Sequence, residues 1–491
     1  MNSISVIFPE ILLLLMTCII AVADLWVTDA KRRPTFWLTQ ITLLVVAVLH
    51  FMAYHNANTI YAMNRMVVSD PMGHLLCGFA CLAMMVSMAY AQPYLASRDM
   101  LKGEFFTLSL MVLLGICVMC SANNFLVVYL GLELMSLSLY ALTALRRDHA
   151  QATEAAMKYF VLGALASGFL LYGLSMMYGA TGTLDIPKVF ESIATGRINR
   201  DVLIFGSVFV VAGLGFKLGA VPFHMWVPDV YHGAPTAVTL LIGGAPKLAA
   251  FAIVMRLLVE GMLSLAVDWQ QMLIVMAVGS LLVGNLAAIA QTNLKRMLAY
   301  STIAQMGFLL LGMSAGVISG NTLSGGNAYS SAMFYVVSYV LTTLGTFGLI
   351  LYLSREGFES EEIADLAGLG QRAPWLAAVM TVFMFSLAGV PPMVGFYAKL
   401  SILQALITTN LTPYLVLAVV AVLFSLVGAF YYLRVVKVMY FDAPTQLSRP
   451  QHSAGMSAVL ALNGLAVLGF GLLPGGLMNL CRDAIVKALS S

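Results

Sequence analysis

The sequence predicts an all-α polytopic membrane protein with about fourteen transmembrane helices. Hydrophobic residue types make up 61% of its 491 residues and charged types only 10%, whereas about a quarter of a typical soluble domain is charged. The mean hydropathy of +0.92 points the same way. The net charge of +3 is small and spread along the chain, which argues against a nucleic-acid partner.

The individual helices follow from the apolar stretches, because one membrane crossing needs about 20 mainly apolar residues. The predicted spans are roughly 5–26, 35–54, 71–93, 104–121, 124–144, 153–178, 202–223, 235–258, 269–291, 296–318, 329–353, 375–407, 412–440 and 457–478. The first span has no basic leading segment and no small-residue cleavage site, so we interpret it as a retained helix. The connections at 179–201 and 354–374 are the longest polar segments, and we expect ordinary loops there.

One span is predicted to be broken. The stretch 375–407 is too long for a straight crossing, and Pro391 and Pro392 follow Gly389 in its middle. Two adjacent prolines remove two backbone donors. Such a break persists in a membrane only inside a bundle or beside a wet cavity.

The orientation follows from the basic residues in the connections. Lysine and arginine concentrate after odd-numbered spans, as at Lys31–Arg33 and Arg146–Arg147. The exception is 185–201, where acidic residues offset the basic ones. Because basic loops stay in the cytoplasm, we expect both termini on the outer, periplasmic side.

A weak internal symmetry relates spans four to eight to spans nine to thirteen. Units of five spans must lie in opposite orientations, which is the inverted repeat of many transporters. The fourth helix of each unit carries a buried lysine and a local break, in spans seven and twelve, although Glu133 lacks an acidic counterpart in span ten. The predicted divisions are an N-terminal group of three helices at 1–100, a first repeat at 104–260, a second repeat at 268–440 and a C-terminal helix at 441–491.

Four charged side chains inside predicted spans stand out: Glu133, Lys217, Lys247 and Lys399. A charge at mid-membrane costs roughly 2.5–3.5 kcal/mol on insertion scales. One carboxylate and three amines suit the transfer of protons better than the binding of an organic substrate. We therefore interpret these residues as proton-transfer groups.

Each of the four also has a structural interpretation. Glu133 and Lys217 could form a switch for proton loading or a permanent ion pair that fixes the register of two helices. Lys247 follows Gly243, Gly244 and Pro246, so it could carry a proton or simply bind carbonyls freed by the break. Lys399 could face an outward exit or extend its amine toward the interface.

Several auxiliary residues remain ambiguous. Glu154 and Lys158 have the i, i+4 spacing of a helix salt bridge and could equally mark proton entry. Glu10 in span one is similarly open, and His224 and His232 fit a loop better than a metal site. Hydroxyl groups could support water wires or be ordinary buried groups; they belong to Tyr300, Ser301, Thr302, Tyr335 and Tyr339.

The cysteines favour packing over metal binding. Cys77 with Cys81, and Cys117 with Cys120, have helical spacing, but the sequence places no histidine or further cysteine beside them to complete a site. A phosphate-binding loop, an iron–sulfur cysteine cluster and a pair of intramembrane histidines for haem are also missing from the sequence. We therefore expect redox or hydrolytic chemistry to occur in other proteins.

Three motifs carry a resemblance to a known family. They are GLGFKLGAVPFHMWVPDVYHGAPT at 213–236, QTNLKRMLAYSTIAQMG at 291–307, and the segment 386–399, which begins SLAGVPP and ends GFYAK. In their residues and in their order along the chain, these motifs resemble those of the antiporter-like membrane subunits of respiratory complex I, which are related to multisubunit cation/proton antiporters. The PDVY and GAP sequences at 228–235 resemble the subunit N branch, the bacterial counterpart of mitochondrial subunit 2, and the chain ends without the long lateral helix of the largest paralogue.

The resemblance implies a function and a set of partners. It implies proton translocation in a bacterial NADH:quinone oxidoreductase, with Glu133 and Lys217 as a coupled pair, Lys247 as the central amine and Lys399 as the terminal proton site. It also implies no cofactor in this chain, since NADH, flavin mononucleotide (FMN), iron–sulfur clusters and quinone would be handled by other subunits. The expected partners are antiporter-like paralogues, small membrane subunits and lipids. Two alternatives stay open: a subunit of a cation/proton antiporter, and a structural membrane scaffold.

Overall fold

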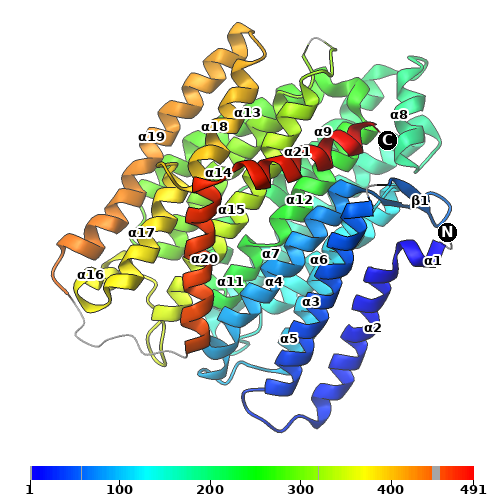
Figure 1. Cartoon of the computed structure of the whole chain (residues 1–491). Coiled ribbons are helices and arrows are strands. Elements are labelled where there is room, and N and C mark those ends of the chain that lie inside the picture. Colours follow the sequence, from blue (N-terminus) through cyan, green and yellow to red (C-terminus); the bar gives the residue numbers. More distant parts are fainter. Residues whose placement is uncertain (1–2, 57, 319, 445–453, 491) are drawn as a thin grey trace.

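The protein is a bundle of long, mostly parallel or antiparallel helices, seen in a computed structural model (Figure 1). The structure describes residues 3–56, 58–318, 320–444 and 454–490. Within that part of the chain, thirteen helical stretches are long and apolar enough to cross a membrane. The two shorter apolar helices α17 (Pro374–Ala388) and α18 (Val394–Ile407) together occupy the remaining predicted span. The all-α polytopic architecture and the break in 375–407 are thus confirmed.

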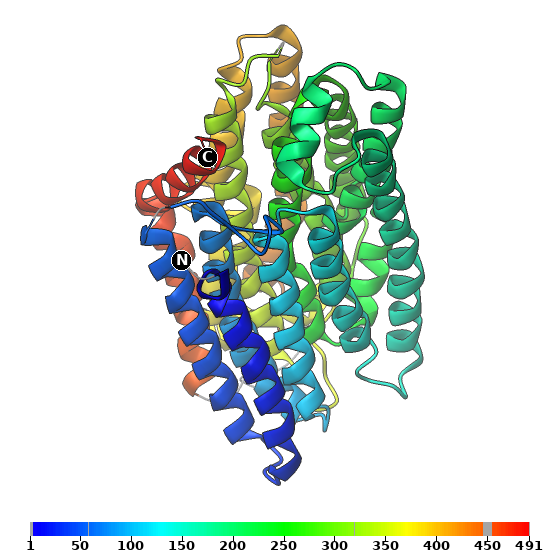
Figure 2. The same ribbon diagram turned by 90° about the vertical axis from the view of Figure 1, so that its right-hand side faces the viewer.

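The N-terminal group forms one side of the bundle (Figure 2). Its α4 starts where the Asp70 carboxylate accepts a hydrogen bond from the Gly73 backbone N–H, at 3.0 Å, which is an N-cap. The elements are α1 (Ser3–Val6), α2 (Phe8–Ala23), η1 (Asp24–Trp26), α3 (Arg33–Asn56), β1 (Ile60–Ala62), β2 (Val67–Ser69) and α4 (Pro71–Ala96). The two short strands pair antiparallel and close the α3–α4 connection.

The first predicted repeat contains two breaks. The α9 helix ends at Leu218, well before the predicted limit of 223, because Gly219 takes the left-handed conformation (φ +79°) and Pro222 follows. Span eight, predicted as one helix, is interrupted at Gly244. The elements are α5 (Gly103–Cys120), α6 (Phe125–Thr143), α7 (Ala150–Thr181), α8 (Ile186–Ala194), α9 (Arg200–Leu218), α10 (Trp226–Gly233), α11 (Thr236–Gly243), α12 (Pro246–Val254) and the π-helical η2 (Met255–Gly261).

The second predicted repeat and the C-terminal part follow. Here α17 ends at another left-handed glycine, Gly389 (φ +85°). The remaining elements are η3 (Leu263–Leu265), α13 (Ala266–Ile289), α14 (Leu294–Ser314), α15 (Gly325–Leu353), η4 (Ile363–Leu366), α16 (Leu369–Arg372), α19 (Thr412–Phe441), α20 (Ala454–Leu472) and α21 (Gly475–Ser490).

Two connections and the C-terminal part differ from the prediction. The loop expected at 179–201 contains α8, which the Asp185 carboxylate caps, and the loop expected at 354–374 contains η4 and α16. The single C-terminal helix predicted for 441–491 is two helices. The second of them, α21, lies across the bundle (Figure 1) and packs on α4 and α15. Its polar and apolar residues alternate at helical spacing, so a hydropathy criterion for spans does not find it.

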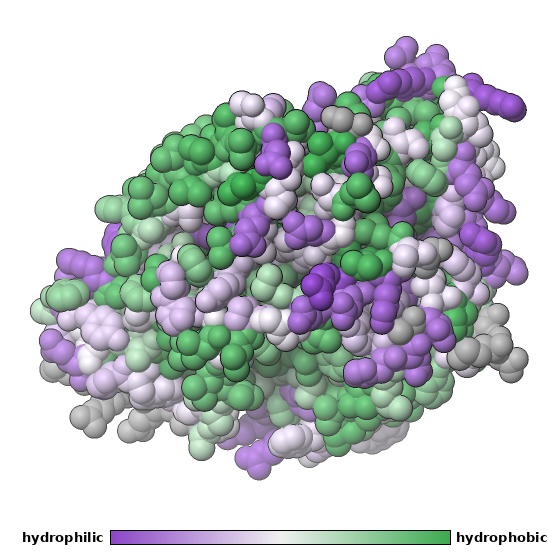
Figure 3. All heavy atoms as spheres, turned by 45° about the horizontal axis from the view of Figure 1, so that its top comes forward, coloured by the Kyte–Doolittle hydropathy of each residue, from purple (hydrophilic) through white to green (hydrophobic). Residues whose placement is uncertain are grey.

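The core and the lipid-facing surface separate clearly. The apolar window within 236–261 is fully buried and that of α14 nearly so, whereas only 22% of the apolar window in α19 is buried. Exposed apolar side chains cover the outer faces of α2, α3 and α19. In Figure 3, hydrophilic side chains lie across the middle of the molecule and along its right-hand edge, and apolar side chains dominate its upper left and its lower side. Charged and hydroxyl side chains inside this core are therefore shielded from lipid by neighbouring helices.

The two predicted repeats share local features. Asn124 caps α6 and Asn293 caps α14, and each of these asparagines also pairs its backbone with an acidic residue, Asp185 or Glu362, that starts a later helix. These shared features agree with an inverted repeat. The repeat itself and the four predicted divisions of the chain stay predictions.

Candidate functional site

Lys217 lies at the end of α9, next to the left-handed Gly219. Its amine donates a hydrogen bond to the Ser136 hydroxyl of α6 at 2.8 Å. Glu133 is one turn before Ser136 on the same helix, and its Oε1 is buried without a hydrogen-bond partner among the described residues. Glu133 and Lys217 are therefore neighbours, but the direct ion pair that we considered between them is not formed.

Lys247 occupies the first turn of α12, directly after the interruption at Gly244. Its side chain is 2% exposed. Its amine donates to the Leu218 carbonyl at 2.8 Å and lies 5.8 Å from the centre of the Trp226 ring. Leu218 is the last residue of α9, so this amine meets the negative end of a helix dipole. No carboxylate of the described residues pairs with Lys247.

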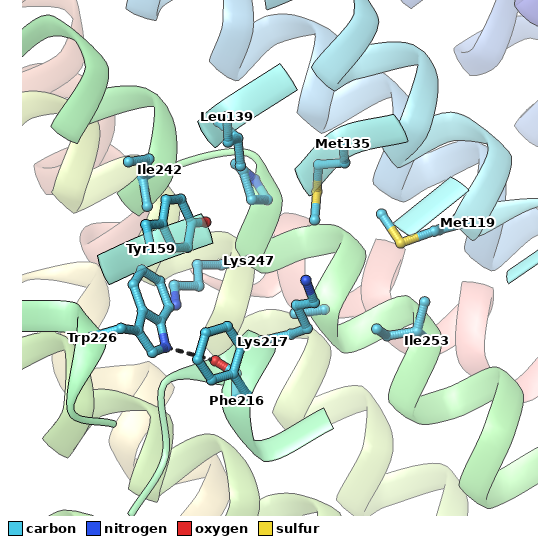
Figure 4. A pocket seen from close by; sticks show the side chains of 12 residues that line it. Met119, Met135, Leu139, Tyr159, Phe216, Lys217, Trp226, Ile242, Lys247 and Ile253 are labelled. Carbon is cyan, nitrogen blue, oxygen red and sulfur yellow. Dashed lines mark hydrogen bonds between the residues drawn. The ribbon is translucent and has the colours of Figure 1, made fainter. Parts of the chain in front are cut away.

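A small cavity joins these two lysines (Figure 4). It offers about 20 Å³ to the centres of water molecules, and a single water needs roughly 10–15 Å³. Tyr159 stacks on Trp226 with ring centres 4.7 Å apart, and the indole N–H donates to the Phe216 carbonyl at 3.0 Å. This aromatic pair forms one wall of the cavity and is itself held by the end of α9.

Lys399 lies one to two turns into α18. It is 8% exposed, and its amine donates to the Ala388 carbonyl at 2.9 Å and to the Ser425 hydroxyl at 3.0 Å. Ala388 is the last residue of α17. The amine thus contacts the C-terminus of a broken helix, as Lys247 does, and does not extend toward the interface.

A chain of hydroxyl and amide groups occupies the region of α14 and α15 next to Lys399. The Tyr339 hydroxyl donates to Thr302 at 2.8 Å, and Gln305 donates to the Tyr432 hydroxyl at 3.0 Å and accepts from the Tyr335 hydroxyl. Two further small cavities, each offering about 10 Å³ to water centres, are lined by these groups. Lys399 lines one of them, and Tyr339 lines both.

Tyr231 of α10 lies between the two regions. Its hydroxyl is buried without a hydrogen-bond partner among the described residues. Gly243, just before the break in span eight, lies against both this hydroxyl and Thr343 of α15. A polar group therefore stands between the first cavity and the hydroxyl chain.

The auxiliary residues are placed as follows. Lys158 bridges Glu154 and Asp229, each at 2.8 Å, so the expected helix salt bridge is formed and extends to α10. His224 is partly buried in the connection between α9 and α10, away from any cluster of metal-ligating groups among the described residues. Tyr300 makes no side-chain hydrogen bond in the described part of the chain, whereas its neighbours Ser301 and Thr302 belong to the hydroxyl chain.

Sequence reasoning missed several charged groups. Asp229, quoted only as part of a motif, also pairs with Arg296 of α14 at 2.9 Å. Arg256 lies inside predicted span eight, is 2% exposed and pairs with Asp70 at 2.6 Å and with Glu260 at 2.7 Å. The signal for Arg256 was available, since an arginine within an apolar run needs an acidic partner.

One prediction about the cysteines is wrong. We expected no histidine beside them, but His50 of α3 lies with Cys77 and Cys117, and their ligand atoms all lie within 4.8 Å of one another. His50 is far from both cysteine pairs in sequence and comes from a third helix. Spacing along the chain could not reveal this contact.

Fold and site together define a class: a multi-pass membrane protein with broken helices and uncompensated buried amines, the plan of an ion-translocating subunit. The family model described as "NADH:quinone oxidoreductase/Mrp antiporter, TM" matches residues 122–425. This chain therefore belongs to the NADH:quinone oxidoreductase/Mrp antiporter transmembrane family.

Individual proteins agree with this assignment. The chain is 62% identical to NADH-quinone oxidoreductase subunit N of Polaromonas naphthalenivorans, over 99% of this chain and 98% of that protein. It is 60% identical to subunit N of Herminiimonas arsenicoxydans over the full length of both. Among solved structures it is similar to a chain of respiratory complex I from Thermus thermophilus with bound aureothin, with a TM-score of 0.80 and 28% identity, over 97% of this chain and 100% of that one.

Proposed function

We propose that this chain is a proton-translocating membrane subunit of a bacterial NADH:quinone oxidoreductase, located in the inner membrane. The names of its relatives support the complex, and the buried amines support the role within it. Its partners are then other membrane subunits of that complex, including antiporter-like paralogues. NADH, FMN, iron–sulfur clusters and quinone are bound by other subunits, and this chain contributes only a proton path.

The observation that carries the proposal is the setting of Lys247. Its amine is buried, contacts a helix C-terminus rather than a carboxylate, and shares a cavity with Lys217. A helix end supplies only about half a unit of negative charge, whereas a carboxylate would supply a full one. The protonated amine is thus stabilised enough to exist inside the bundle, but not so strongly that it cannot release its proton.

The path runs through the four predicted residues. Protons enter from the cytoplasmic side, where Lys158 and Asp229 lie, and reach Lys217 beside Glu133. They pass through water to Lys247, continue along Tyr231, Tyr339 and the hydroxyl chain, and leave by way of Lys399; both termini are periplasmic. Moving each charge against 100 mV requires about 2.3 kcal/mol, which electron transfer in other subunits supplies.

The test is proton uptake by the complex reconstituted in liposomes and driven by NADH oxidation. We expect Lys247→Ala to lower uptake at least roughly tenfold, because positioned proton-transfer groups commonly contribute 10²–10⁴ in rate, while the complex still assembles. Lys437→Ala is the matched control, since this lysine is exposed near the end of α19 and pairs with Asp442. Loss of assembly in the Lys247 variant alone would favour the scaffold, and normal uptake would contradict the proposal.

The second candidate is an antiporter subunit, because the family's description includes Mrp antiporters. Replacing sodium and potassium by choline separates the two. Uptake by the reconstituted complex should be unchanged without the alkali cations if only protons move. A strict dependence on sodium or potassium would favour the antiporter.

A further inference from the structure

A cluster of soft ligand groups is buried where α3, α4 and α5 meet, and none of its members lines the cavity of the lysines. Each of three adjacent helices contributes: His50 from α3, Cys77 and Cys81 from α4, and Cys117 from α5. All four side chains are at most 1% exposed. We propose that His50, Cys77 and Cys117 hold a thiophilic d¹⁰ divalent cation of the zinc class, with Cys81 beside it.

The distances suit such an ion. A ring nitrogen of His50, the Cys77 sulfur and the Cys117 sulfur lie within 4.8 Å of one another. Zinc binds thiolate sulfur at about 2.3 Å and imidazole nitrogen at about 2.0–2.1 Å in a tetrahedron. Small adjustments of three side chains would therefore enclose one ion. Cys81 is one turn beyond Cys77, on the same face of α4, and its thiol is buried beside these ligands.

The hydrogen bonds of His50 support this assignment independently. Its Nδ1 lies 3.0 Å from Nδ1 of His74, whose Nε2 lies 2.7 Å from the Ser69 hydroxyl. The Nε2 atom of His50 is buried and has no hydrogen-bond partner among the described residues. A buried imidazole nitrogen without a partner is unfavourable, and a metal ion would satisfy it.

The same hydrogen bonds are compatible with the tautomer that binds metal. If His74 donates from Nε2 to Ser69, its Nδ1 is free to accept from Nδ1–H of His50. The Nε2 atom of His50 then carries a lone pair. Histidine ligands of metals are held in this way, with the second ring nitrogen donating to a neighbouring group.

Charge balance also favours a divalent ion. Binding of Zn²⁺ forms two zinc–thiolate bonds and releases the two protons of Cys77 and Cys117, so the ion, the two thiolates and a neutral imidazole have no net charge. A neutral site avoids the cost of burying a charge among apolar helices. The ion would join α3, α4 and α5 at the end that carries the β1–β2 connection.

The test uses the full chain, purified with its thiols reduced and loaded with Zn²⁺ or Co²⁺. We expect one Zn²⁺ per chain by elemental analysis, and with Co²⁺ the visible d–d and sulfur-to-cobalt charge-transfer bands of a tetrahedral thiolate site. Cys117→Ala should lower the affinity at least tenfold, and His74→Ala should lower it roughly 10- to 100-fold, because His74 orients the His50 ring. Cys481→Ala is the matched control, since Cys481 is equally buried but lies in α21.

Three results would overturn the proposal. They are failure of the reduced wild-type chain to take up either ion, equal Zn²⁺ affinity of the Cys117 and Cys481 variants, and a Cys77–Cys117 disulfide in chain isolated from cells without reductant. The Co²⁺ spectrum of the wild-type chain needs no variant. It therefore remains decisive if a substitution impairs folding.

Discussion

The lysine at the break in span eight and the lysine after the break in span twelve make the same contact by different routes. Lys247 binds the carbonyl of Leu218 and Lys399 binds that of Ala388, and each carbonyl ends a helix that stops at a left-handed glycine. The sequence suggested Lys217 and Lys399 as counterparts, because both lie in the fourth helix of a predicted repeat. By contacts, the counterpart of Lys399 is Lys247.

The difference between the two regions lies in what surrounds the amine. The first region has a second amine, Lys217, on the same small cavity, and the carboxylate Glu133 lies one turn from Ser136, the partner of Lys217. The second has a single amine beside a chain of hydroxyl groups. The dipole of a broken helix can thus stabilise a buried amine that has no carboxylate partner. The neighbouring side chains determine whether that amine exchanges a proton with another titratable group or with a chain of hydroxyl groups.

The largest expected effect tests whether the two amines, Lys247 and Lys399, are equivalent. Because Lys399 makes the same kind of contact as Lys247, Lys399→Ala should lower proton uptake by the reconstituted complex at least roughly tenfold, with assembly preserved. The check is uptake during NADH oxidation, with Lys437→Ala as control. If the Lys399 variant kept normal uptake, the two amines would not be equivalent.

Substitutions of the glycines at the two breaks distinguish the two regions. An alanine Cβ at position 389 would lie 2.8 Å from Cδ of Lys399, whereas one at position 219 would lie 2.7 Å from Cγ2 of Val227. Both substitutions place a side chain at positive φ, at a cost of about 1–2 kcal/mol. Gly389→Ala should therefore reduce proton uptake more than Gly219→Ala for a similar loss of thermal stability.

The control for this pair is Gly469→Ala in α20, since an added Cβ there meets no atom within 4 Å. Equal losses of uptake in the two break variants would show that strain alone, rather than displacement of Lys399, governs the effect.

The serines beside the amines give a smaller effect. Ser136 is the hydrogen-bond partner of the Lys217 amine, whereas Lys399 has both Ser425 and a backbone carbonyl. A net hydrogen bond is worth about 0.5–1.5 kcal/mol, so Ser136→Ala should slow uptake by up to about tenfold. Ser425→Ala should slow it less, and Ser175→Ala, at an exposed helix position, should leave it unchanged. A larger effect at Ser425 would reverse this ranking.

The smallest effect concerns Asp229 in the connection between spans. Burial opposes its ionisation, but hydrogen bonds from Lys158 and Arg296 outweigh burial and hold its pKa below the usual value. A lowered pKa in the folded state stabilises the protein above the unfolded value of about 3.9, and the gain is lost as the pH falls through the folded value.

We therefore expect Asp229→Asn to lower the midpoint of thermal unfolding slightly at pH 7, since partly exposed ion pairs contribute about 0–1 kcal/mol each. The difference from the wild-type chain should shrink as the pH falls below about 4. A difference that grew in acid would contradict this account of the pair.

Sequence patterns predicted the features that depend on local composition. Apolar stretches located the spans, and the two prolines located the break between α17 and α18. Contacts between distant helices could not be predicted: nothing local indicates that the Lys247 amine reaches Leu218, or that His50 meets Cys117. The amphipathic α21 and the capped α8 were missed because a hydropathy criterion for spans does not register helices of mixed polarity.

The central claim is that the buried amines exchange protons, and Lys247→Arg tests it most directly. Arginine keeps a positive charge at the end of α9 but does not release its proton near neutral pH. The measurement is protons taken up per NADH oxidised by the reconstituted complex, together with the NADH oxidation rate. We predict an assembled complex with strongly impaired uptake; normal uptake in this variant would show that the charge of Lys247 is only structural.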